Sequence, residues 1–124
     1  MRRWVMLGGI FGCLAVILGA LGAHSLKAVL NPQQLAAFKT AVHYQMVHAL
    51  ALVLTGLLAG SNAPVHPRRI QRAGGCFVAG ILLFSGSIYG LTLGGPGFLG
   101  PLTPLGGLSF MAGWLFLTFS IRKD

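Results

Sequence analysis

The side chains that could do chemistry in this sequence stand inside or at the ends of long apolar stretches. Tyr44 and His48 are four residues apart in one stretch, and Ser85 and Tyr89 are four apart in another. Residues at this spacing share one face of a helix, so each pair is expected to point in a common direction. The candidate polar cluster consists of His24, Tyr44, Gln45, His48, Ser85, Ser87, Tyr89 and Thr103.

Three kinds of chemistry are open to this candidate polar cluster. The imidazoles of His48 and His24 could handle protons or line a pocket for a small molecule. The same two histidines could bind a metal ion or haem, but no carboxylate or thiolate joins them. The third possibility is a network of hydrogen bonds between helices, each worth about 0.6 kcal/mol within a membrane. Because this network needs no ligand, it is the interpretation that we favour. His43 faces another side of its helix and is not included.

Acidic residues are almost absent, and this excludes several classes of enzyme. The single carboxylate side chain is Asp124, at the last position. Glycoside hydrolysis needs a pair of carboxylates, and a Ser-His-Asp triad needs one buried against its histidine, so a lone terminal Asp124 supports neither these nor magnesium held by carboxylates. The sequence contains no Walker-type phosphate-binding motif and no nucleophile-elbow motif, and Cys13 and Cys76 are too far apart for a C-x-x-C motif. We therefore predict no catalytic residue, no metal site and no cofactor.

The elements that position the candidate polar cluster are four apolar stretches near residues 4–23, 41–60, 73–94 and 103–121. Hydrophobic residues make up 55% of the chain and charged residues 8%, against about 25% charged residues in soluble domains. Each stretch approaches the roughly 20 residues that cross a hydrocarbon core. The sequence predicts an all-α integral membrane four-helix bundle, with residues 1–124 as a single domain. The first stretch also resembles a signal peptide, but its regular pattern of small residues favours a retained span.

The positions of lysine and arginine predict the orientation of the bundle. Seven of the nine lie at the two termini or between the second and third stretches, whereas Lys27 and Lys39 lie in the first connection. Because cytoplasmic segments carry the excess of positive charge, both termini are expected in the cytoplasm. The candidate polar cluster then falls in the outer half of the bundle, with His48 about 9 Å below the interface. At that depth the residues expected to satisfy its ring nitrogens are Ser85, Ser87, Tyr89 and, on its own helix, Tyr44.

The net charge of +8 does not indicate a nucleic-acid-binding protein. The basic residues form small groups beside apolar stretches rather than one continuous basic face. Such groups are typical of contacts with anionic lipid head groups. We expect membrane lipid as a partner, no nucleic acid, and a location as a multi-pass protein of the bacterial inner (plasma) membrane.

Two connections carry local signals. Asn31, Pro32 and Gln34 match an N-cap, a first helical residue and the third position of a capping box, so a helix is expected to start there and continue into the second span. The last connection, residues 94–101, is rich in glycine and proline and is predicted to be non-helical.

Small residues recur at steps of three and four, which predicts close helix packing. Without a hydrophobic driving force between helices in lipid, close backbone approach becomes a principal source of association. The candidate packing positions are Gly8, Gly12, Ala15, Gly19, Gly22, Gly86, Gly90, Gly106 and Gly113.

Several motifs, in order, resemble a known family. They are Leu18–His24 (LGALGAH), Tyr44–Ala51 (YQMVHALA), Leu83–Tyr89 (LFSGSIY), Thr103–Gly107 (TPLGG) and the pair Gly113-Trp114. Together they are similar to domain-of-unknown-function family 423, the YgdD-like small inner-membrane proteins. The resemblance covers nearly the whole chain and implies a four-span bacterial inner-membrane protein. It implies no activity, substrate or cofactor, so it carries over no catalytic residue.

Three functional hypotheses follow from these observations. The first is a non-catalytic helix-packing module that forms a homo-oligomer or serves as an accessory subunit of a larger membrane complex. The second is a protein that binds or conducts a small molecule or protons through the candidate polar cluster. The third is a redox membrane protein that binds haem or a metal.

Overall fold

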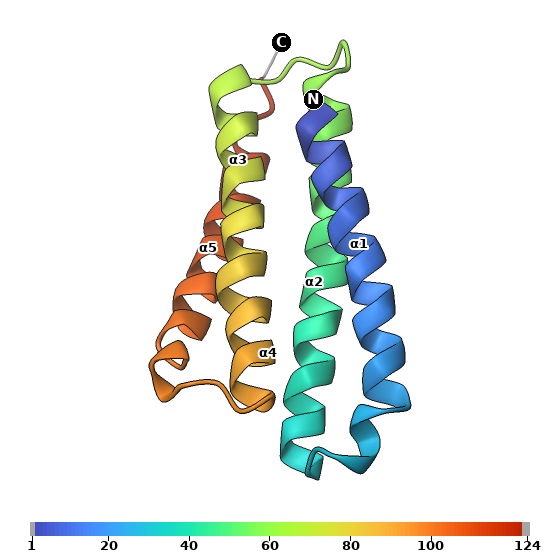
Figure 1. The fold of residues 1–124 in the computed structure, drawn as a ribbon. Helices are drawn as coiled ribbons and strands as arrows, with labels where there is room; N and C mark the ends of the chain where they lie inside the picture. The colour runs from blue at the N-terminus through green and yellow to red at the C-terminus, as the bar shows by residue number, and fades with distance from the viewer. Residues whose placement is uncertain (1, 123–124) are drawn as a thin grey trace.

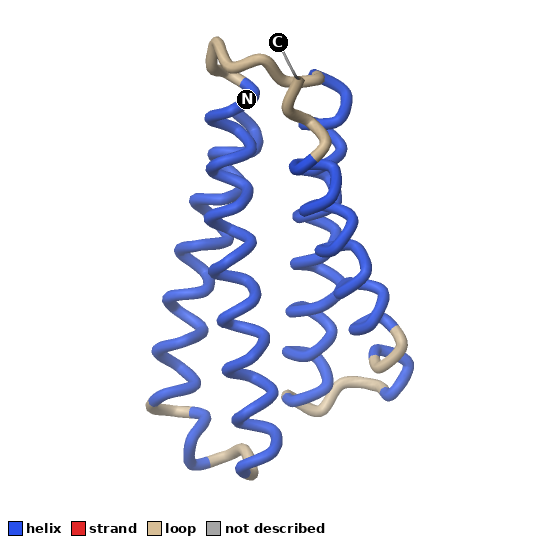
Figure 2. Tube along the Cα trace, turned by 180° about the vertical axis from the view of Figure 1, so that it is seen from behind, coloured by secondary structure: helices blue, strands red, loops and turns tan. Residues whose placement is uncertain are grey.

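The computed structural model describes residues 2–122, which form four helical rods running side by side (Figures 1 and 2). The third rod is α3 and α4 joined by a π-helical turn, and two one-turn 3-10 helices lie in connections. The prediction of an all-α fold is confirmed. The elements are α1 (Arg2–Ala23), the 3-10 turn Leu26–Ala28, α2 (Pro32–Ala59), α3 (Pro67–Gly80), the π turn Ile81–Ser85, α4 (Gly86–Thr92), the 3-10 turn Gly97–Leu99 and α5 (Leu102–Thr118).

α2 begins where the capping signals predict. The Asn31 side chain accepts a hydrogen bond from the Gln34 backbone N–H at 2.8 Å, and the Gln34 side chain accepts one from the Asn31 N–H at 3.0 Å. Pro32 is the first helical residue. This reciprocal capping box satisfies two N–H groups that would otherwise lack partners. The predicted continuous helix is confirmed, since α2 runs 28 residues to Ala59.

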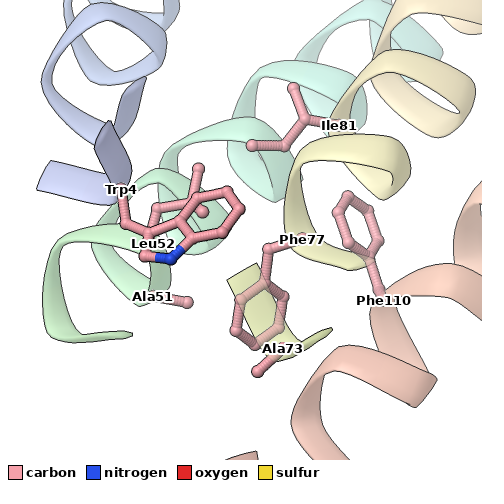
Figure 3. Packing of buried hydrophobic residues seen from close by; sticks show 7 residues of the cluster. All are labelled: Trp4, Ala51, Leu52, Ala73, Phe77, Ile81 and Phe110. Carbon is pink, nitrogen blue, oxygen red and sulfur yellow. The ribbon is translucent and has the colours of Figure 1, made fainter. Parts of the chain in front are cut away.

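The rods form two antiparallel hairpins. α1 packs along α2, and α5 packs along the third rod, while α2 also contacts the third rod and joins the two hairpins (Figure 1). Buried apolar side chains from all four rods meet in one core (Figure 3). The core residues are Trp4, Ala51, Leu52, Ala73, Phe77, Ile81 and Phe110.

The arginine-bearing segments lie at one end of the bundle. Both ends of the described chain are found there, next to the connection between α2 and α3 (Figure 1). The His66 N–H donates to the Ser120 carbonyl at 2.6 Å, and the Arg122 N–H donates to the Pro64 carbonyl at 2.8 Å. These bonds tie the segment after α5 to the α2–α3 connection. We call this the arginine end; it carries Arg2, Arg3, Arg68, Arg69, Arg72 and Arg122.

The last connection differs from its predicted non-helical form, because Gly97–Leu99 makes one 3-10 turn. Pro96 precedes this turn, and Gly94 adopts a left-handed conformation with φ of 93° that permits the sharp reversal after α4. The Leu99 side chain then folds back onto Gly90, where an added Cβ would lie 2.5 Å from Leu99 Cδ1. The glycine at position 90 therefore accommodates its own loop rather than another rod.

The small residues of α1 face α2, as their spacing predicts. A Cβ added at Gly8 would lie 2.7 Å from the Ala49 carbonyl oxygen, and one at Gly22 would lie 3.0 Å from the Phe38 ring. Gly19 and Gly12 are less tightly enclosed, since their added Cβ atoms would lie 3.4 Å and 3.9 Å from α2 side chains. Ala15, on the same stripe, is buried.

In the third rod the packing positions differ from the predicted ones. Gly86 is exposed, and an added Cβ there would meet only the Ile81 carbonyl oxygen at 4.0 Å, so it is not at a helix crossing. The close crossings are at Gly74, against the Trp4 indole, and at Gly80, against the Phe110 ring. The π turn explains the displacement of Gly86, because its extra residue rotates all later side chains around the helix axis relative to a regular α-helix.

The two candidate glycines of α5 are at close crossings with the third rod. A Cβ at Gly113 would lie 2.7 Å from the Phe77 ring, and one at Gly106 would overlap the backbone of Phe84 in the π turn. The backbones of α5 and the third rod therefore approach each other directly at Gly106.

Candidate functional site

Gln45 connects three of the four rods. It is 3% exposed, and its Nε2 donates to the Phe11 carbonyl of α1 at 2.8 Å. The Tyr89 hydroxyl of α4 donates to Gln45 Oε1 at 2.6 Å. A buried amide with both ends engaged fixes the relative positions of α1, α2 and α4.

The hydroxyl groups make a second set of contacts nearby. Ser85, fully buried in the π turn, donates to the Ala41 carbonyl of α2 at 2.7 Å. Ser87 donates to the Phe84 carbonyl at 2.9 Å and lies 2.6 Å from the Thr103 hydroxyl of α5. Since a hydroxyl has one proton to donate, Thr103 is the donor to Ser87. These contacts join α2, the third rod and α5.

His48 is buried, and its hydrogen bonds are made with other groups. Its Nδ1 is 2.7 Å from the Tyr44 carbonyl, and its Nε2 accepts a hydrogen bond from the Trp114 indole of α5 at 3.0 Å. The ring stacks on Phe110, with centroids 3.6 Å apart and planes 10° apart. Because an indole N–H only donates, Nε2 carries no proton, and Nδ1–H is the donor to Tyr44. Both ring nitrogens of a neutral imidazole are thus occupied.

This placement differs from the expected partners of His48. Shared depth favoured Ser85, Ser87, Tyr89 and, on its own helix, Tyr44 as the partners of His48. The structure instead pairs its ring with the Tyr44 backbone carbonyl and the Trp114 indole. Trp114 is the thirteenth residue of α5, so it lies toward the arginine end of that helix. Trp114 was missed because tryptophan counts as apolar, although its N–H in an apolar stretch was a usable signal.

The remaining members of the candidate polar cluster are peripheral. Tyr44 is 41% exposed and contributes its ring, packed 4.8 Å from Phe84, rather than its hydroxyl. His24 is exposed just beyond the end of α1, and only its backbone N–H is bonded, to the Ala20 carbonyl. The structure therefore does not bring His24 and His48 together.

A further polar contact at the arginine end was not predicted. Gln71 Oε1 accepts hydrogen bonds from the Trp4 indole at 2.9 Å and from the Arg3 guanidinium at 2.6 Å. These bonds join the start of α1 to α3. Within residues 2–122, every buried side-chain nitrogen and oxygen has a hydrogen-bond partner.

Comparison with known proteins decides the family. Residues 18–107 match the family described as a protein of unknown function, DUF423. The chain belongs to this family. It is 37% identical to a UPF0382 membrane protein of Staphylococcus haemolyticus, over 99% of this chain and 98% of the relative. It is 38% identical, over the same shares, to the UPF0382 membrane protein YwdK of Bacillus subtilis. No solved structure matches the chain significantly.

Family membership fits the apolar character of the rods. The relatives are named membrane proteins, and three helical segments are long and apolar enough to cross a bilayer. This DUF423 protein is therefore a small membrane protein with transmembrane helices. The three segments are Arg2–Ala23, Pro32–Ala59 and Pro67–Thr92.

A groove opens sideways between α1 and the third rod of this DUF423 protein. It has a volume of about 190 Å³ and reaches Gln45 and Tyr89 at its floor, but His48 does not line it. Among the described residues, no three His, Cys, Asp or Glu side chains are placed to hold one metal ion. The arrangement can hold helices together through hydrogen bonds. The other residues that line this groove are Phe11, Leu14, Leu18, Ile81, Leu82 and Gly86.

Proposed function

We propose that this DUF423 protein is a non-catalytic helix-packing module, which self-associates or serves as an accessory subunit of a membrane complex. The observation that carries the proposal is the environment of His48. Both of its ring nitrogens are used in hydrogen bonds within the protein, to Tyr44 and Trp114, so neither is directed at a ligand or a proton path. Gln45 is used in the same way.

The energetics of a bilayer support this role. Lipid does not drive helices together, so close packing and interhelical hydrogen bonds must do so. Gly8, Gly106 and Gly113 provide close crossings, and Ser85 and Gln45 provide hydrogen bonds between rods.

The outer face of α1 is a suitable surface for association. It leaves large apolar side chains exposed, including Ile10 at 54%, Val16 at 62% and Met6 at 59%. Lipid, another copy of the chain or another membrane protein can cover such a face without unpaired polar groups.

We further propose four crossings of the bacterial plasma (inner) membrane, with both termini in the cytoplasm. α5 has 17 residues and a length of about 25 Å, within the range of spanning helices. The arginine end combines both chain ends with the α2–α3 connection, and such concentrations of positive charge favour the cytoplasmic side.

Reporter fusions test this topology. After the C-terminus, a reporter that works only in the cytoplasm is expected to be active, and one that works only outside it is expected to be inactive. Between Gly97 and Gly100 the opposite is expected: only a reporter that works outside the cytoplasm should be active. The reverse pattern at both positions would contradict the proposed orientation, and the same side at both would contradict a crossing by α5.

The groove beside Gln45 and Tyr89 favours a second candidate function, the binding of a small molecule. A third, redox chemistry with haem or a metal, is less well supported because His24 and His48 lie apart.

For the non-catalytic module, protein purified from membranes in mild detergent should show no haem absorption band and less than one-tenth equivalent of any transition metal. Stoichiometric haem or metal would overturn the proposed function in favour of the redox alternative.

A further inference from the structure

A second groove lies at the arginine end, on the outside of the bundle between α3 and α5. It has a volume of about 390 Å³, within the range of ligand sites. Its walls are apolar except for one guanidinium. The lining residues are Arg69, Ala112, Leu115, Phe116 and Phe119.

Arg69 is held in place at the mouth of this groove. Its Nη1 donates to the Phe119 carbonyl at 2.9 Å, at the C-terminal end of α5. A guanidinium has five N–H donors in a planar fork, so the remaining donors are available to another acceptor. Within residues 2–122, Arg69 is thus a cation fixed by one hydrogen bond, with its other donors unused.

A second cation borders the same groove. The Arg72 guanidinium carbon lies 6.0 Å from the centroid of the Phe116 ring, one of the groove walls. No Asp or Glu occurs in residues 1–123, so within the described residues neither arginine has a carboxylate side chain as its counterion. Within residues 2–122 this corner therefore carries an excess of positive charge, which attracts anions.

The two halves of the groove together suit one kind of ligand, an anion attached to a hydrocarbon chain. Its mouth suits an anionic group that accepts several N–H bonds, and its body, with Leu115 58% exposed and Phe119 62% exposed, suits hydrocarbon. We infer that the α3–α5 groove binds one anionic glycerophospholipid, with its phosphate on Arg69 and Arg72 and an acyl chain along Phe116 and Phe119. This inference goes beyond the proposed packing function and does not depend on it. Basic pockets between helices bind anionic lipid head groups in other membrane proteins.

Competition between two lipids tests the inference. The purified protein would be mixed with equimolar phosphatidylglycerol and phosphatidylcholine in mild detergent, and retained lipid would be counted by native mass spectrometry. The wild type is expected to retain one phosphatidylglycerol in preference to phosphatidylcholine. Arg69→Gln is expected to reduce this preference about fivefold, the contribution of one basic residue near an anionic surface.

Two further variants separate the groove from general charge. Arg68→Gln removes a neighbouring arginine that does not line the groove, and it should keep most of the preference. Ala112→Phe keeps the charge but fills the groove, and it should lower lipid occupancy several-fold. Circular dichroism would show which variants fold; if Arg69→Gln does not, the wild type and Ala112→Phe decide the matter.

Three results would overturn the inference. Equal retention of the two lipids by the wild type would show that the groove does not select an anion. Equal losses in Arg68→Gln and Arg69→Gln would show that charge acts at the whole arginine end rather than in the groove. A lipid-free dimer that Ala112→Phe converts to monomer would assign the groove to a second copy of the chain.

Discussion

Gly106→Leu is expected to destabilise the four-rod bundle of this protein strongly. Even a single methyl group at this position would overlap the Phe84 backbone in the π turn. Backbone atoms cannot rotate away as a flexible side chain can, so α5 would have to separate from the third rod. That separation would also pull apart the contact between Thr103 and Ser87. We therefore expect Gly106→Ala to lower the free energy of unfolding by about 1–3 kcal/mol, and Gly106→Leu by more.

The adjacent glycine is a matched control. A Cβ added at Gly107 would meet nothing within 4 Å, so Gly107→Leu and Gly107→Ala should change the free energy of unfolding by no more than about 0.5 kcal/mol. Reversible unfolding in mixed detergent micelles, followed by circular dichroism, measures all four variants. Equal tolerance at the two positions would show that α5 and the third rod do not approach closely at Gly106.

Local signals in the sequence predicted the parts of the fold that depend on neighbouring residues. The capping box needs only Asn31 and Gln34, three residues apart, so its sequence determines where α2 begins. The small residues of α1 likewise lie on one uninterrupted helix, and their steps of three and four predicted a single packing stripe. The helix that covers this stripe, α2 at Gly8 and Gly22, was not specified by the spacing.

The third rod shows where periodicity fails. Predicting Gly86 as a packing position assumed a regular helix, and the π turn at Ile81–Ser85 breaks that regularity. The π turn occurs where Gly106 meets the Phe84 backbone and where Ser85 bonds to Ala41 of α2. These are contacts with other rods, so the local sequence does not reveal them.

Only part of the candidate site was predicted, because its other contacts also depend on which rods lie side by side. The sequence grouped Gln45 with Tyr89, and the structure places them in hydrogen-bond contact. It also grouped His24 with His48, because helix depth was counted from the apolar stretches alone. The depth of a residue in a helix does not show which neighbouring helix the residue faces. The sequence placed the partner of His48 on the third rod, whereas the structure places it on α5.

His48→Leu is expected to destabilise the bundle by about 2 kcal/mol. The change leaves the Trp114 indole N–H without its acceptor in an apolar environment, and it removes the ring stacked on Phe110. An unpaired buried donor costs about 1–3 kcal/mol, and an aromatic pair contributes about 0.5–1.5 kcal/mol. His43→Leu on the same helix is the control, because His43 is exposed. A change of less than about 0.5 kcal/mol is expected there; similar losses at both histidines would contradict the specific role of His48.

A double-mutant cycle between His48 and Trp114 tests the central claim most directly, namely that the buried polar side chains hold the helices together. Unfolding free energies would be measured for the wild type, His48→Leu, Trp114→Phe and the double variant. If the hydrogen bond joins α2 to α5, the double variant should be more stable than the sum of the single losses predicts, with a coupling energy of about 0.6–1.7 kcal/mol. Single losses that add within experimental error would contradict the claim and would leave His48 free for another role.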